Sequence, residues 1–138
     1  MNEAQPVPQE IVGADAVARA VGEWPCFHDA EIQRLVLDAL DLGHGGPTLL
    51  LEVAVDEPCD HVRRRTGAQA ATVVEFRFHG VRNLALDSFQ AQNVMDGISI
   101  RAAPDDQGAR VFSVRVAASL GLECTFLCTR AETRVKPT

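Results

Sequence analysis

Apolar residues recur at every second position in several short runs of this sequence. The clearest run is residues 72–79, where Thr72, Val74, Phe76 and Phe78 alternate with Val73, Glu75, Arg77 and His79. Side chains of a β-strand point to opposite faces in turn, so this pattern predicts a strand with one buried face. The runs are separated by turns and not by helical stretches of about 10–15 residues, which favours antiparallel pairing.

The same pattern predicts further strands before and after this run. They are expected at about 31–40, 48–55, 98–102, 112–116 and 122–128, with a short continuation of the central run through Leu84 and Leu86. We therefore expect an α+β, mainly β fold. It would be a single curled or sandwiched antiparallel sheet of six or seven strands, with one or two short helices as covers.

Two segments have helical signals. The first begins at Gly13 and is stopped by Gly22 and Pro25. The second is a short helix over residues 89–95, in which Phe89 and Val94 would face inward. Gln92 and Asn93 would then hydrogen-bond to backbone groups of an irregular segment.

Length and composition indicate one globular domain. The chain has 138 residues, of which 46% are hydrophobic and 23% charged, and these values exclude a disordered protein. Residues 11–131 are expected to form the domain. Residues 1–10 contain two prolines and little hydrophobic pattern, and residues 132–138 are polar, so both ends are expected to be flexible tails.

The chain is acidic, since 13 lysines and arginines against 19 aspartates and glutamates give a formal net charge of −6. Nucleic-acid binding depends on basic side chains, so nucleic acid is not an expected partner. No stretch is apolar enough to span a membrane, and the N-terminus lacks the pattern of a signal peptide. We therefore expect a cytoplasmic protein with no membrane partner, whose four cysteines stay reduced: Cys26, Cys59, Cys124 and Cys128.

Residues 23–32 gather the only tryptophan, a cysteine, a histidine and several carboxylates. His28 beside Asp29 fits a general base with an orienting partner. However, adjacent side chains of an extended chain point to opposite sides, and no nucleophile elbow, phosphate loop or zinc-protease helix accompanies them. Two other interpretations stay open: these side chains fix the start of the first strand by hydrogen-bonding nearby backbone, or they contact a partner.

A metal site is the alternative. The spacing of Cys26 and His28 recurs at Cys59 and His61, and two such pairs would complete a tetrahedral zinc shell. The one-residue gap is shorter than the usual spacing of about two to four residues in structural zinc sites, which weakens this signal. The alternative is thus a small zinc-stabilised domain or a metal-dependent hydrolase that uses Cys26, His28, Cys59 and His61.

Other polar residues are assigned structural roles. The arginine run 63–65 is expected in a solvated loop, although it could also bind an anion. His44 and His79 are expected at the surface or on a strand face. Cys124 and Cys128 recur on one face of the last predicted strand and are expected to pack in the core.

Four sequence blocks suggest a relationship to a known family. Trp24-Pro25 followed by Phe27-His28-Asp29-Ala30-Glu31-Ile32 resembles the opening signature of the bacterial immunity protein 50 family of polymorphic toxin systems. Later blocks follow in a similar order: Phe78-x-Gly80-Val81, Phe89-x-x-Gln92-Asn93-Val94 and Gly121-Leu122-Glu123-Cys124-Thr125-Phe126. The chain departs from the family pattern at Cys26, where a small hydroxyl residue is expected, and at Gln90-Ala91, where an asparagine is expected nearby.

The resemblance implies a small cytoplasmic antitoxin that binds one cognate toxin domain and blocks it, without catalysis, cofactor or metal. The partner-contact candidates are Trp24, His28, Asp29 and Glu31, because tryptophan is enriched at interface hot spots. Burial beneath the early helix is the competing role of Trp24. An acidic surface would speed association with a basic partner.

Overall fold

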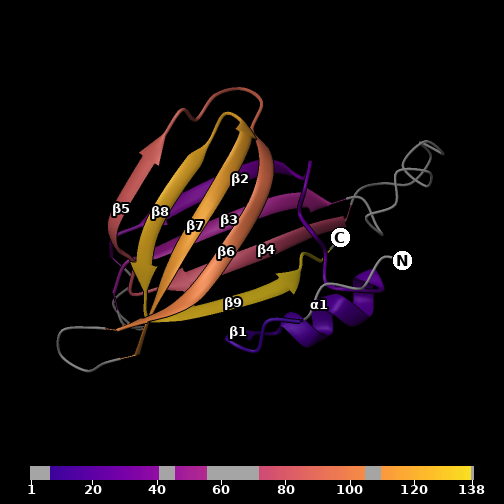
Figure 1. Ribbon diagram of the computed structural model, residues 1–138, viewed down its shortest axis with the longest axis horizontal. Helices are drawn as coiled ribbons and strands as arrows, with labels where there is room; N and C mark the ends of the chain where they lie inside the picture. The colour runs from indigo at the N-terminus through magenta and orange to yellow at the C-terminus, as the bar shows by residue number, and fades with distance from the viewer. Residues whose placement is uncertain (1–6, 41–45, 56–71, 105–109, 138) are drawn as a thin grey trace.

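The structure is a computed structural model that describes residues 7–40, 46–55, 72–104 and 110–137. Within these ranges the chain forms nine strands and one helix (Figure 1). In chain order they are β1 (Ile11–Val12), α1 (Ala14–Val21), β2 (Glu31–Asp38), β3 (Thr48–Val55), β4 (Thr72–His79), β5 (Arg82–Asp87), β6 (Val94–Pro104), β7 (Arg110–Leu120), β8 (Glu123–Cys128) and β9 (Arg130–Val135).

The described strands form a single mixed sheet in the order β1-β9-β4-β3-β2-β6-β7-β8-β5. All neighbours pair antiparallel except β1 and β9, which pair in parallel. The mainly β class is confirmed. The expected six or seven strands are too few, because β1 and β9 were not predicted, and the expected purely antiparallel pairing is wrong, because β1 and β9 pair in parallel.

The C-terminal tail predicted for residues 132–138 is wrong up to Val135. Strand β9 lies inside the sheet, between β4 and β1, with Phe78 opposite Ala131 and Glu75 opposite Arg134. Ala131 and Thr133 are buried, while the charged residues between them point to the other face. The inward residues of this strand are only weakly hydrophobic, so the alternation is hard to see and the segment resembles a polar tail in the sequence.

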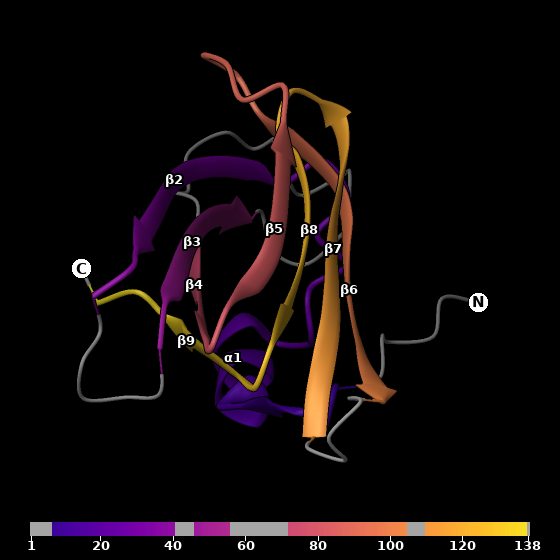
Figure 2. The ribbon, with the colours of Figure 1, turned by 90° about the vertical axis from the view of Figure 1, so that its left-hand side faces the viewer.

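The sheet folds over on itself into two layers (Figure 2). Strands β1, β9, β4, β3 and β2 form one layer, and β6, β7, β8 and β5 form the other. The layers are joined through a short β2–β6 pairing, at which Glu31 lies opposite Val94. Helix α1 lies across one end of the space between them and buries Ala14, Val17 and Val21 (Figure 2).

The chain crosses between the layers at two adjoining corners. One corner is Gly80 between β4 and β5, and the other is Thr129 between β8 and β9. The Thr129 backbone N–H donates to the His79 carbonyl oxygen at 2.8 Å. Gly80 has φ 66°, and a Cβ there would lie 2.5 Å from Thr129 Oγ1. Only glycine combines this backbone conformation with this close approach.

Aromatic rings in contact connect the two layers through the core. Phe76 and Phe78 of β4 stack with their centroids 6.0 Å apart, and Phe78 meets Phe126 of β8 edge-on at 4.9 Å. Trp24 and Phe27 pack against Phe76 at 6.3 and 5.4 Å. We call these five residues the aromatic row. Such offset and edge-on pairs contribute about 0.5–1.5 kcal/mol each beyond their burial.

The second predicted helix, over residues 89–95, is absent from the described structure, and β6 begins at Val94. Asn93 explains this: its Nδ2 donates to the Gln90 carbonyl at 2.7 Å, and its Oδ1 accepts from the backbone N–H groups of Gln90 and Leu122. These bonds hold an irregular connection in place of a helix. Asn93 therefore plays the expected backbone-bonding role. Phe89, predicted to face inward, is 57% exposed.

The cysteines differ in state. Cys124 and Cys128 are free and buried, as expected for core residues, and burial raises the pKa of each thiol to about 11. Cys26 is disulfide-bonded, which contradicts the expectation of a reduced thiol. Cys59 lies outside the described residues.

The structure also bears on the expected lack of a membrane partner. In the described ranges, no helix has the length and apolar character that a membrane crossing requires.

Replacing Gly80 tests the paired corners. Gly80→Ala is expected to lower the free energy of unfolding by about 1–3 kcal/mol, because alanine adds a left-handed backbone penalty and a clash with Thr129. Gly97→Ala is the matched control, since a Cβ there meets no atom within 4 Å. Urea denaturation measures both. Equal stability of the two variants would contradict the corner argument.

Buried thiols with a raised pKa should resist alkylation. Iodoacetamide at about pH 8, where an unperturbed thiol is partly ionised, is expected to modify neither Cys124 nor Cys128 in the folded protein. Both should react after unfolding in urea. Peptide mass spectrometry reads the two positions separately from Cys26. Modification of either thiol in the folded state would show that the β7–β8 side of the core opens.

Candidate functional site

The predicted site residues lie on a sharp turn between α1 and β2. Phe27 has φ 60° and Asp29 has φ 66°, both in the left-handed region that residues other than glycine rarely adopt. The Asp29 N–H donates to the Met95 carbonyl at 2.9 Å, and the Met95 N–H donates to the Ala30 carbonyl at 2.7 Å. These bonds tie the turn to the start of β6. The turn is therefore strained and firmly held.

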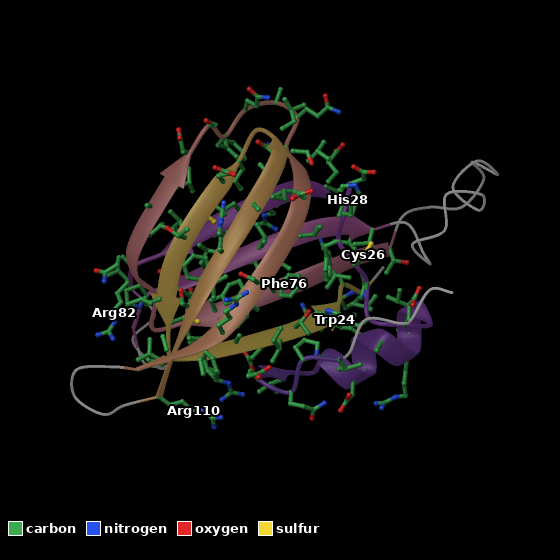
Figure 3. The ribbon with its side chains drawn as sticks, viewed as in Figure 1. Trp24, Cys26, His28, Phe76, Arg82 and Arg110 are labelled. Atoms are coloured by element: carbon green, nitrogen blue, oxygen red, sulfur yellow. The ribbon has the colours of Figure 1, made fainter. Side chains whose placement is uncertain are left out.

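Burial of Phe27 offsets the strain. Its ring is 3% exposed and packs between Trp24 and Phe76, with centroid distances of 5.5 and 5.4 Å. Since the preceding ring is fixed in the core, His28 is directed outward. Figure 3 shows His28 on the outside of the fold and Phe76 in its interior.

His28, Asp29, Glu31 and Asp96 form an exposed group that we call the His28 corner. His28 Nδ1 lies 3.2 Å from Asp96 Oδ1, and His28 Nε2 lies 3.6 Å from Asp29 Oδ1. The side chains of His28, Asp29 and Asp96 are 54%, 39% and 59% exposed. Glu31 is also exposed, at the first position of β2. Two carboxylates thus flank one imidazole on the surface, and Glu31 follows three residues later in the chain.

The His28 corner is an exposed part of the surface. A general base works best in a water-poor pocket that positions its substrate. The cavity lined by Val12, Gly13 and residues of β4 and β9, and the cavity lined by residues of β5, β7 and β8, contain no residue of the His28 corner. The corner presents negative charge at the surface on a backbone that is held by hydrogen bonds.

Trp24 occupies a different place from the other three predicted contact residues. It is 8% exposed and belongs to the aromatic row, so it has little surface to offer a partner. The structure brings His28 and Asp29 together at the surface, leaves Glu31 exposed at the start of β2, and buries Trp24. Asp96 joins the corner from β6. The sequence did not predict this contact, because residues 28 and 96 meet only through the pairing of β2 with β6.

The zinc alternative loses one of its ligands. Cys26 is disulfide-bonded, so it has no thiolate to give a metal ion. Its other proposed ligands besides His28 are Cys59 and His61, which lie outside the described residues. Across the part of the chain that is described, no three histidine, cysteine, aspartate or glutamate side chains group in a way that could hold a metal ion.

A second polar surface, which the sequence reasoning missed, covers the outer side of the β2–β3–β4–β9 layer. We call it the charged face. Strand pairing places Arg34 opposite Glu52, Glu52 opposite Glu75, and Glu75 opposite Arg134. The next row carries Arg77 opposite Glu132. The full set is Arg34, Glu52, Glu75, Arg77, Arg130, Glu132, Arg134 and Lys136.

Glu52 and Glu75 are neighbouring carboxylates that are both buried. Like charges in adjacent positions repel, so each needs a cation. Glu52 contacts Lys136 at 3.0 Å and Arg34 at 3.4 Å, and Glu75 contacts Arg134 at 3.1 Å. The cations lie above their carboxylates and are largely exposed. The exposed cations of the face therefore point to solvent, and they neutralise the buried carboxylates of Glu52 and Glu75 beneath them.

His79 is on this face but is not a lone surface histidine. It is 9% exposed, and its Nε2 lies 2.6 Å from Glu132 Oε2. Glu132 Oε1 accepts from Arg130 at 2.9 Å. The hydrogen bond with His79, followed by the charge of Arg130, lowers the pKa of Glu132 below its ordinary 4.5. His44 lies outside the described residues.

Comparisons with protein-family models, with curated proteins and with solved structures returned no match for this chain.

The Glu132 pair predicts a pH dependence. Because the folded-state pKa is below 4.5, the ionised carboxylate stabilises the fold fully above that value and loses this contribution as pH falls through the lowered pKa. Glu132→Gln is expected to cost about 1 kcal/mol at neutral pH. The difference in unfolding free energy between Glu132→Gln and the wild type should disappear in acid, where Glu132 is protonated. Urea unfolding at several pH values measures it, with exposed Glu10→Gln as control; a gap that persists in acid would contradict this assignment.

Proposed function

We propose that this protein is a non-catalytic immunity protein that binds and neutralises a toxin domain, and that the His28 corner is its contact surface. The observation that carries the proposal is a strained turn, hydrogen-bonded to β6, that places the exposed carboxylates of Asp29 and Asp96 on either side of His28. The resemblance of residues 24–32 to the immunity protein 50 signature supports it from the sequence.

Rigidity is the first physical argument. A surface that is already in its bound conformation loses less entropy when it binds. The corner is fixed from below by Phe27 in the aromatic row and from the side by its hydrogen bonds to Met95. Maintaining left-handed φ angles at Phe27 and Asp29 costs free energy, and such strain persists where the surrounding structure enforces it.

Charge is the second argument. Asp29, Glu31 and Asp96 present negative charge on a chain whose net charge is −6. This pattern fits a basic surface on the toxin domain, such as one that engages a phosphate-containing or otherwise anionic substrate. Complementary charges raise association rates by about 10- to 1000-fold at low salt, which suits an inhibitor that must act before its target does.

A charge-neutral corner tests the proposal. The variant Asp29→Asn with Asp96→Asn should keep the fold, because asparagine tolerates left-handed φ well. It is expected to slow association with the toxin domain encoded beside its gene by at least about tenfold and to weaken growth rescue on coexpression. Surface plasmon resonance at low and high salt measures the rates.

The matched control removes two carboxylates elsewhere. Glu10→Gln with Asp87→Asn changes the net charge equally, at exposed positions outside the corner. It is expected to bind and rescue like wild type. Equal losses in both double variants would show that only net charge matters and would refute the corner as the contact surface. Failure of the wild type to bind any neighbouring toxin would refute the immunity function itself.

A further inference from the structure

A cavity of about 340 Å³ lies where β1 leads into α1, beside β4 and β9. Figure 1 shows these elements together at one side of the fold. Four of its lining residues belong to the charged face, namely Glu75, Arg77, Glu132 and Arg134, and Val12, Gly13 and Thr133 complete the lining. Pockets that bind small molecules are about 300–1,000 Å³, so this one suits a small ligand.

The two carboxylates of the lining are already engaged. Glu75 is buried and contacts Arg134 at 3.1 Å. Glu132 contacts His79 through one oxygen at 2.6 Å and Arg130 through the other at 2.9 Å. The Thr133 hydroxyl donates to the Glu75 carbonyl at 2.8 Å. Because both carboxylates already have protein partners, they do not make the cavity a cation site.

Arg77 differs from its neighbours. It lies directly opposite Glu132 in the strand register, yet both Glu132 oxygens are occupied by other residues. Within the described ranges, the exposed Arg77 guanidinium has neither an ion pair nor a hydrogen bond. An arginine presents five N–H donors in a planar fork that matches carboxylate and phosphate groups.

The surrounding charge has the same sign. The charged face carries five cations and three carboxylates, a sum of +2, so the rest of the chain sums to −8. Arg134 is 62% exposed and uses one nitrogen for Glu75, so other N–H groups remain for a ligand. The four charged residues that line the cavity sum to zero, and the net positive charge of the face comes from Arg34, Arg130 and Lys136.

We propose that this cavity binds a small organic anion, whose carboxylate or phosphate group is held by Arg77 with Arg134 as the second donor. The site shares no residue with the His28 corner, so it is independent of the proposed toxin contact. Val12 and the backbone at Gly13 form its less polar wall. The ligand is a compact molecule, since the cavity is near the lower limit for ligand pockets.

Calorimetric titration with two probes tests the site. Inorganic phosphate represents a phosphoryl group and succinate a carboxylate, and the tighter binder identifies the chemistry of the ligand. Arg77→Gln is expected to weaken binding of that probe at least about tenfold, as is usual for loss of a charged hydrogen-bonding partner. Arg101→Gln, at an exposed position on β6, is the matched control and should bind like wild type.

Amide chemical-shift changes give a second readout that does not depend on affinity. Saturating probe should shift the signals of Gly13 and Thr133 in wild type and leave them unmoved in Arg77→Gln. The proposal is overturned if neither probe binds saturably below about 10 mM. It is also overturned if Arg101→Gln weakens binding as much as Arg77→Gln, because the anions would then respond only to net charge.

Discussion

Contact between aromatic rings across the two layers is the interaction on which the rest of the structure depends. The chain has only seven aromatic residues, and five of them form the aromatic row. Phe78 and Phe126 join β4 to β8 through the core, and Phe76 joins β4 to the segment before β2. Since the described β2 and β6 pair only briefly, these rings supply much of what keeps the folded sheet closed.

The same row links the core to the surface. Phe27 reaches the interior only because its backbone adopts a left-handed conformation, and this conformation turns His28 outward. The corner is therefore rigid as a consequence of core packing. The charged face has a different origin, since it depends on strand register, which places Arg34, Glu52, Glu75 and Arg134 in one row.

Much of the fold was predictable because its long strands carry strong patterns. The predictions for β3 and β4 match the observed strands at 48–55 and 72–79, and α1 lies between Gly13 and Gly22 as expected. A two-residue strand such as β1 carries no periodic signal, and its parallel pairing depends on where β9 lies. Residues 89–93 were misread because the side-chain bonds of Asn93 replace the helical pattern.

The site was predictable only in part. Adjacent polar residues drew attention to His28, Asp29 and Glu31, whereas Asp96 lies far away in the sequence and meets His28 only after folding. Trp24 could be a contact or a core residue on sequence grounds, and burial decides that it packs in the core. The charged face was missed because its residues alternate with small or apolar ones on four separate strands.

Lys136 follows the last strand, yet its ammonium group reaches back to Glu52 in the middle of the layer. The far end of the described chain thus forms an ion pair with Glu52, a carboxylate that is largely shielded from water. Trimming the protein just before this lysine would leave that carboxylate with Arg34 alone. Shortening this end would therefore remove a cation from a buried carboxylate of β3, a central strand of the layer, although the sequence there reads as dispensable.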